Sequence, residues 1–164
     1  MDDHMIAEIL DILEKDAKTG VKDIAKMLGE DEAAVEKAVR QLEDDRVIAK
    51  YSAVVNLEKT NVEITEALIE VKVTPQRDLG YDDIAKRIYR FNEVKAVYLM
   101  SGTYDLSVLV QAPTMKQISK FVFEKLAVLD GVRSTVTHFI MRKYKEHGVV
   151  FIEDEEDDRL VISP

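Results

Sequence analysis

The chain of 164 residues carries 32 acidic and 23 basic side chains, for a formal net charge of −9, and contains three histidines and no cysteine. The missing cysteines exclude a disulfide framework and any cysteine-ligated metal site, and the scattered histidines offer no metal-ligand spacing. No apolar run approaches the roughly 20 residues that span a bilayer, and the acidic start differs from a secretory signal, so we expect a cytoplasmic protein without membrane contact.

The acidic charge is concentrated at the two ends of the sequence. Residues 1–50 hold fourteen acids and eight bases, and residues 153–158 are all acidic, whereas acids and bases nearly balance between these segments. A global negative charge argues against indiscriminate binding of nucleic acid, but a local basic patch can still bind DNA.

The first fifty residues have the apolar periodicity of three short helices. Apolar side chains recur at helical spacing over residues 6–13, 21–28 and 35–42. Gly29 is placed to end the second helix, and Asp31 is placed to cap the third. We therefore predict a compact three-helix bundle, which is too small to be very stable alone.

After the helical segment the apolar period changes to that of strands. Residues 47–56 are rich in β-branched side chains and predict a strand, and the polar residues 57–61 predict a linker between two domains. Strands are then predicted at 64–73, 94–100, 106–112 and 134–144, with a hairpin connection at 101–105. Helices are predicted from Tyr81 onward and over 114–129. The second of these is capped by Thr114, with Gln117 three residues later. This order predicts a ferredoxin-like βαββαβ domain with both helices on one face of an antiparallel sheet.

The other face of the predicted sheet is also apolar in part. Side chains alternate between the two faces of a strand. In the strand at 106–112, Leu109 therefore points to the opposite face from Leu106, Val108 and Val110. In the last strand, Val136 and Ile140 likewise point to the opposite face from Phe139 and Met141. Polar side chains are expected on a sheet face that is exposed to water. We therefore expect the uncovered face to pack against another subunit, with scattered surface hydrophobic residues as the alternative.

Two sets of motifs occur in a fixed order along the chain. The first half contains Leu28-Gly29, Val39-Arg40-Gln41-Leu42-Glu43 and Val47-Ile48, and the second half contains Gly102-Thr103-Tyr104-Asp105 and Asp130-Gly131-Val132 followed by Thr135-x-Thr137. In this combination the chain resembles the Lrp/AsnC (feast/famine) family of transcriptional regulators from about residue 5 to residue 146.

The resemblance implies an α+β protein with a helix-turn-helix DNA-binding domain (1–50), a strand linker (51–63) and a ferredoxin-like ligand-sensing and oligomerisation domain (64–146). The acidic C-terminal extension (147–164) lies outside the usual family pattern. It further implies a regulator of double-stranded DNA that dimerises through its sheets, assembles into tetramers or octamers, and binds an amino acid or similar metabolite between ferredoxin-like domains. No enzymatic activity, metal or cofactor is expected.

The candidate DNA contacts lie in and around the third helix. They are Lys26, Ala33, Ala34, Lys37, Arg40 and Arg46, the alanines as contacts to thymine methyl groups. This helix departs from the family, because acids occupy residues 30–32 where small hydroxyl residues are usual, Ala38 replaces an arginine, and Arg46 replaces a glycine. Acids beside phosphates oppose DNA binding.

The candidate effector contacts lie in the predicted sheet domain. They are Gly102, Tyr104, Asp105, Thr135 and Thr137. The Asp105 carboxylate would hold an α-ammonium group by a charge-assisted hydrogen bond, or it is a turn residue that bonds backbone. The two threonines share one strand face and either meet the ligand or are ordinary strand residues.

Two other functions stay open at this stage. In one, the chain is a metabolite-sensing oligomer that keeps the fold and has lost specific DNA binding, which the acidic third helix favours. In the other, it is an enzyme like the siroheme decarboxylases, which share a similar two-domain plan and need basic groups for tetrapyrrole carboxylates. The sequence offers no evident set of histidines and arginines for that role.

Overall fold

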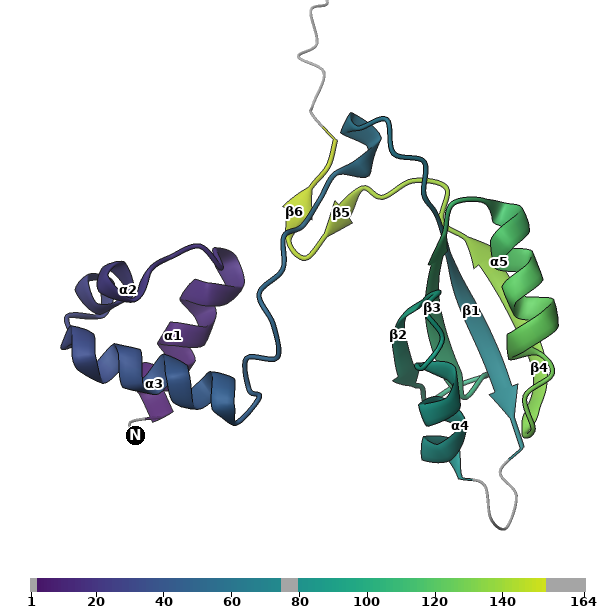
Figure 1. Ribbon diagram of the computed structural model, residues 1–164, viewed down its shortest axis with the longest axis horizontal. Coiled ribbons are helices and arrows are strands. Elements are labelled where there is room, and N and C mark those ends of the chain that lie inside the picture. Colours follow the sequence, from purple (N-terminus) through teal and green to yellow (C-terminus); the bar gives the residue numbers. More distant parts are fainter. Residues whose placement is uncertain (1–2, 75–79, 153–164) are drawn as a thin grey trace, which may run out of the picture. The chain divides into compact units, whose positions relative to one another are not determined.

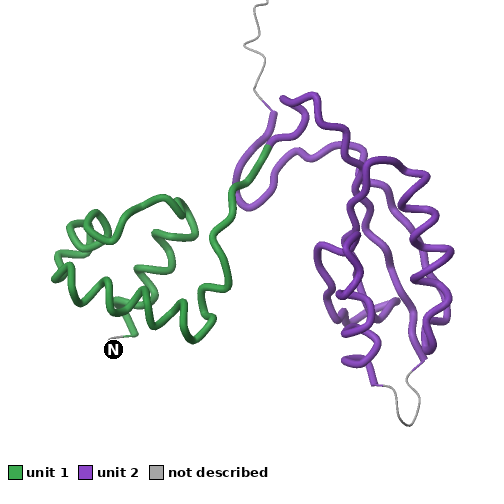
Figure 2. Tube along the Cα trace, viewed as in Figure 1, with its two compact units in different colours: residues 1–55 green, residues 56–164 purple. Residues whose placement is uncertain are grey.

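The computed structural model describes residues 3–74 and 80–152. The chain forms two compact units, residues 1–55 and residues 56–164 (Figure 2), and each unit has its own apolar core. The acidic run at 153–158 lies outside the described residues.

Unit 1 consists of the three predicted helices, α1 (Asp3–Lys15), α2 (Val21–Leu28) and α3 (Glu32–Asp44) (Figure 1). Their apolar stripes meet in a core centred on Ile9, Ile24 and Val35, which are almost completely buried. Gly29 ends α2 in the left-handed conformation, with φ +70°. The Asp31 side chain caps α3 by accepting a hydrogen bond of 3.2 Å from the backbone N–H of Ala34.

The prediction of a strand at residues 47–56 is wrong. A strand needs a neighbour for its backbone N–H and C=O groups, and no strand of the described sheets pairs with this segment. Instead, the Tyr51 hydroxyl donates a hydrogen bond of 2.8 Å to Glu43 Oε1, which fastens the segment to α3. Burial, together with this bond to a carboxylate, raises the pKa of Tyr51. A single 3₁₀ turn, η1 (Leu57–Lys59), follows.

Unit 2 has the predicted ferredoxin-like order of elements. These are β1 (Thr65–Val73), α4 (Tyr81–Ile88), β2 (Val94–Leu99), β3 (Leu106–Ala112), α5 (Met115–Phe121) and β4 (Val132–Phe139). The strands form one antiparallel sheet in the order β2-β3-β1-β4 (Figure 1). In the central strand Ile69 lies opposite Val108 on one side and Thr137 on the other. The buried faces of α4 and α5 cover the same side of the sheet as Ile69, forming one core.

The second helix of unit 2, α5, is shorter than predicted. We expected one helix to Leu129, but α5 ends at Phe121 and the chain continues as a π-helical turn, η2 (Val122–Leu126). In this turn the Ala127 N–H donates a hydrogen bond of 2.8 Å to Val122 O, five residues earlier, where an α-helix would use the residue four earlier. The turn buries Val122 and Leu126 while Phe123 stays 81% exposed. The last strand also ends earlier than predicted, at Phe139 rather than residue 144.

The helix-free face of the sheet combines an apolar band with paired charges. Leu68 and Leu109 lie opposite each other at its centre, and the half-exposed Val136 lies on β4. The central strand also places Glu70 on this face, where its Oε1 lies 3.2 Å from His138 Nε2. The face is therefore less uniformly apolar than the sequence suggested.

A small hairpin joins the end of the ferredoxin-like domain to the C-terminal extension. Strands β5 (Lys145–Glu146) and β6 (Val149–Val150) are joined by two residues with positive φ, the combination that closes tight antiparallel hairpins. Lys143 Nζ lies 2.6 Å from Glu66 Oε2 in β1 and 2.8 Å from Glu146 Oε1. Burial opposes the charge of Lys143, but the two carboxylates outweigh it and raise the pKa of the ammonium group. This ion triad fastens the hairpin to the sheet.

Candidate functional site

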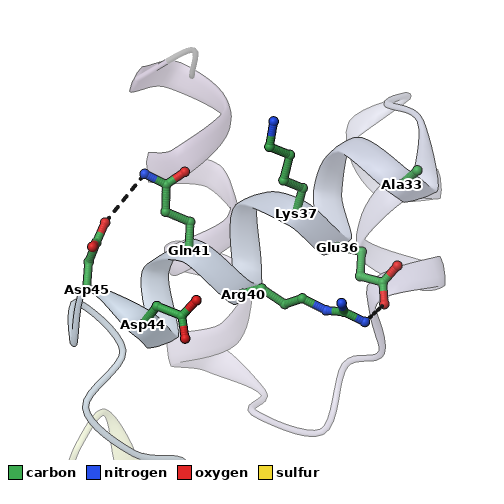
Figure 3. A pocket seen from close by; sticks show the side chains of 7 residues that line it. All are labelled: Ala33, Glu36, Lys37, Arg40, Gln41, Asp44 and Asp45. Carbon is green, nitrogen blue, oxygen red and sulfur yellow. Dashed lines mark hydrogen bonds and ion pairs between the residues drawn. The ribbon is translucent and has the colours of Figure 1, made fainter.

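The exposed side of α3 is a continuous stripe of mostly polar side chains. Its members recur at intervals of three and four residues, which places them on one face of the helix (Figure 3). They are Ala33, Glu36, Lys37, Arg40, Gln41 and Asp44, and with Asp45 they line an open groove. The opposite face of α3 is buried in the core of unit 1. We call these six residues the α3 stripe.

The stripe unites part of the predicted DNA contacts. Ala33, Lys37 and Arg40 lie on it, whereas Lys26 lies on α2 and Arg46 follows α3. The neighbouring Ala34 is exposed in the first turn of α3. The residues that the sequence prediction missed are Glu36, Gln41 and Asp44, although their spacing from Lys37 and Arg40 could have identified them.

Two of the predicted cationic contacts carry an acidic partner. Arg40 Nη2 lies 2.5 Å from Glu36 Oε1, one turn earlier on the stripe (Figure 3), and Lys26 Nζ lies 3.3 Å from Asp23 Oδ1. Lys37 extends from the helix and makes no ion pair within the residues that the structure describes. The stripe can therefore offer one free ammonium group and one guanidinium that a carboxylate holds in place.

Arg46 takes the backbone conformation usually reserved for glycine. Its φ is +56°, and its N–H donates a hydrogen bond of 3.1 Å to Glu43 O at the end of α3. A side chain in this left-handed region costs about 1 to 2 kcal/mol. Arg46 therefore follows α3 in the conformation that glycine adopts most easily.

The candidate effector residue Asp105 is bound to the backbone of the central strand. Its Oδ2 accepts a hydrogen bond of 2.9 Å from Val73 N, and its own N–H donates one of 3.1 Å to Val71 O. Asp105 thus fastens the β2–β3 connection to the end of β1. This is a structural role like the alternative weighed from the sequence, although the bonded backbone belongs to another strand.

The other predicted effector residues lie on both sides of β1. Gly102 and the partly buried Tyr104 belong to the β2–β3 connection, and no described atom lies within 4 Å of a Cβ built on Gly102, whose φ is +154°. Thr135 lies on β4, opposite Val71, on the helix-covered side of the sheet. Because β1 separates β4 from β3, roughly 10 Å separate the backbones of the two groups. Thr137 faces the same side, opposite Ile69.

Replacing Asp105 separates its structural role from its charge. We expect Asp105→Ala to lower the free energy of unfolding by about 1 to 2 kcal/mol, because Val73 N–H loses its acceptor. Asp105→Asn keeps an acceptor oxygen and should stay within about 0.5 kcal/mol of the wild type. Urea denaturation followed by circular dichroism measures both. Equal stability of the alanine variant and the wild type would contradict the role assigned to this bond.

Other classes of site find no support in the described part of the chain. Within residues 3–74 and 80–152, no group of three histidine or acidic side chains could hold a metal ion. In the same ranges, every helix is too short or too polar to cross a membrane.

Known proteins share both the sequence and the fold. Residues 66–150 match the family model described as the Lrp/AsnC ligand binding domain. The chain is 47% identical over 158 residues to YugG of Bacillus subtilis (strain 168), described as an uncharacterized HTH-type transcriptional regulator, and the match covers 96% of this chain and 95% of that protein. It is 30% identical to the HTH-type transcriptional regulator LrpA of Pyrococcus abyssi, with 84% and 94% covered.

Solved structures agree with the fold at lower sequence identity. A transcriptional regulator from Neisseria meningitidis, crystallised as a complex with L-Met, superposes with a TM-score of 0.71 at 22% identity, covering 89% of this chain and 93% of that one. The AsnC protein of E. coli superposes with a TM-score of 0.68 at 18% identity, with 89% and 96% covered. These likenesses confirm the predicted order of a helical N-terminal unit and a ferredoxin-like domain.

Proposed function

The chain belongs to the Lrp/AsnC family of HTH-type transcriptional regulators, a family without enzymatic activity, and from this premise we propose how it binds DNA and what controls it. In this proposal the α3 stripe of each copy enters the major groove of one operator half-site. Residues 1–50 are the DNA-binding domain, residues 51–63 the linker, and residues 64–146 the sensing and assembly domain, acting in the cytoplasm. The role of the extension at 147–164 is left unassigned.

The observation that carries the DNA-binding role is the position of Lys37 and Arg40. Both lie on the exposed face of α3, directly opposite the face that is packed in the core. The second helix of a helix-turn-helix presents such a face to base edges. Lys26 and Arg46 then contact flanking phosphates, while Ala33 and Ala34 contact thymine methyl groups.

We propose that the controlling molecule is an amino acid or a similar metabolite. The L-Met complex of the Neisseria regulator is one such case within the same fold. In this chain Asp105 would hold the α-ammonium group with the carboxylate oxygen that Val73 does not occupy, beside Gly102 and Tyr104. Thr135 and Thr137 would contribute hydroxyl groups. Since roughly 10 Å separate them from Asp105, a small ligand would bridge these groups most easily where two domains meet.

A homodimer formed through the helix-free sheet faces would join two α3 stripes in one assembly. Helix-turn-helix dimers bind half-sites about one duplex turn apart, or multiples of it. An effector bound between dimers would favour one assembly, such as a tetramer or an octamer, and so change how many stripes engage one DNA. Coupling of this kind requires different affinities of the effector for the two assemblies.

A second function is favoured by one observation, the excess of acids on α3. Its exposed residues include four acids and two bases. A protein that senses a metabolite and assembles, without specific DNA binding, would tolerate this composition better than a repressor or an activator.

Gel-shift titration of the full chain against randomised duplexes, at several salt concentrations, tests the proposal. We expect binding at low ionic strength and a linear fall of log Kobs with log salt. Light scattering with and without a panel of amino acids should show a change of assembly with at least one of them. If no duplex binds even at low salt while an amino acid still changes the assembly, the second function replaces the first.

A further inference from the structure

We propose that the Glu36–Arg40 pair reads one G·C base pair of the operator half-site, with Glu36 as the residue that determines specificity. The inference rests on the proposed function, since it assumes that the α3 stripe faces DNA. Arg40 donates to the guanine. Glu36 holds the guanidinium in place and offers its second oxygen to the amino group of the paired cytosine.

The pair has no evident structural purpose. Glu36 and Arg40 lie one turn apart, with side chains that are 50% and 71% exposed. Exposed pairs at this spacing stabilise a helix by only about 0.3 to 0.5 kcal/mol. The pair lies on the stripe and away from the core, so neither side chain supports packing. Its position points to recognition rather than to folding.

An acid at the centre of a DNA-facing stripe disfavours phosphate contacts. Its charge repels the backbone, and its carboxylate competes with any phosphate for Arg40. A guanidinium has five N–H donors, so the bond from Nη2 to Glu36 leaves others available. The Arg40 guanidinium is therefore an oriented donor group, and the Glu36 carboxylate opposes its contact with DNA phosphates.

The major-groove edge of a G·C pair is the chemical complement of this arrangement. Guanine presents the acceptors O6 and N7, which suit a bidentate arginine, and cytosine presents the N4 amino group, which suits a carboxylate. At the corresponding positions an A·T pair has an acceptor, a donor and a second acceptor, beside the thymine methyl group, so the thymine O4 acceptor would oppose the Glu36 carboxylate. Repulsion from phosphates and complementarity to G·C act in the same direction, because both favour specific over non-specific binding.

The test is selection of duplexes from a randomised library by the full chain, followed by affinity measurement. The wild type should enrich half-sites with a G·C pair at one position, defined as the position whose preference is lost in Arg40→Ala. In Glu36→Gln, discrimination at that position should fall roughly 10-fold. Affinity for a scrambled duplex should rise at the same time, with a salt slope steeper by about 1 for each bound chain, because Arg40 becomes free to contact a phosphate.

A matched control is available on α1. Asp11 pairs with Lys15 at the same spacing, with the acid again preceding the base. Asp11→Asn therefore changes the net charge as Glu36→Gln does, but away from the stripe. It should leave the discrimination at the G·C position unchanged. Thermal melts should show that this control and both variants of the pair are folded.

Two results would overturn the inference alone. One is that Glu36→Gln behaves like Asp11→Asn while the wild type binds DNA. The other is that Glu36→Gln loses selection at a different position and keeps the preference assigned to Arg40. Absence of any duplex binding by the wild type would overturn the proposed function as well, so the two failures are distinguishable.

Discussion

Replacing Lys37 and Arg40 together by glutamate is expected to weaken duplex binding by at least about 30-fold, since each such contact is worth about 1 to 3 kcal/mol. The two residues are the only bases on the α3 stripe. Their reversal leaves the stripe with acids that face phosphates and with no cation to offset them. The salt slope of any residual binding should change little, because the proposed phosphate contacts of Lys26 and Arg46 remain. Gel-shift titration at three or more salt concentrations measures both quantities.

The control for this double variant changes the charge equally but elsewhere in unit 1. Lys15→Glu combined with Lys18→Glu alters the end of α1 and the turn after it. It should reduce affinity far less, because screening weakens charges that lie beyond about 10 Å of the DNA. Equal losses in the two double variants would mean that the stripe has no special role.

Leu109→Lys should dissociate the proposed homodimer into monomers. Leu109 lies at the centre of the helix-free sheet face, opposite Leu68, and the bonded strands β1 and β2 flank it. In a face-to-face dimer each introduced ammonium would be buried without a partner, which costs several kcal/mol. We expect the dissociation constant to rise by at least about 1000-fold, or roughly 4 kcal/mol. Sedimentation equilibrium measures the change.

Phe123→Lys is the matched control, because it also replaces an exposed apolar residue of unit 2 by lysine. Phe123 lies on the π-turn η2, is 81% exposed, and is remote from the helix-free face, since the helices cover the other side of the sheet. This variant should keep the dimer. A wild-type chain that stays monomeric and folded at high concentration, or a Leu109→Lys variant that still dimerises, would contradict the proposed interface.

The parts of the fold that the sequence determined are those with local causes. The α-helices of unit 1 follow from apolar periodicity, and the capping by Asp31 and Thr114 depends on a backbone N–H three residues away. The sequence positions of β1 to β4 follow from alternation and turn residues in the same way. The candidate contacts Lys37 and Arg40 were also found from the sequence, because helical spacing alone places them opposite the core face.

Other features were decided by contacts between residues far apart in the chain. Residues 47–56 have the composition of a strand but lack a partner strand among the described residues, and the π-turn η2 departs from the continuous helix that local periodicity predicts. The Asp105 carboxylate meets Val73 N–H across 32 positions, and Lys143 meets Glu66 across 77 positions. Composition and spacing report what a segment prefers, whereas partners of this kind become neighbours only when the sheet has formed, so only the tertiary structure could reveal them.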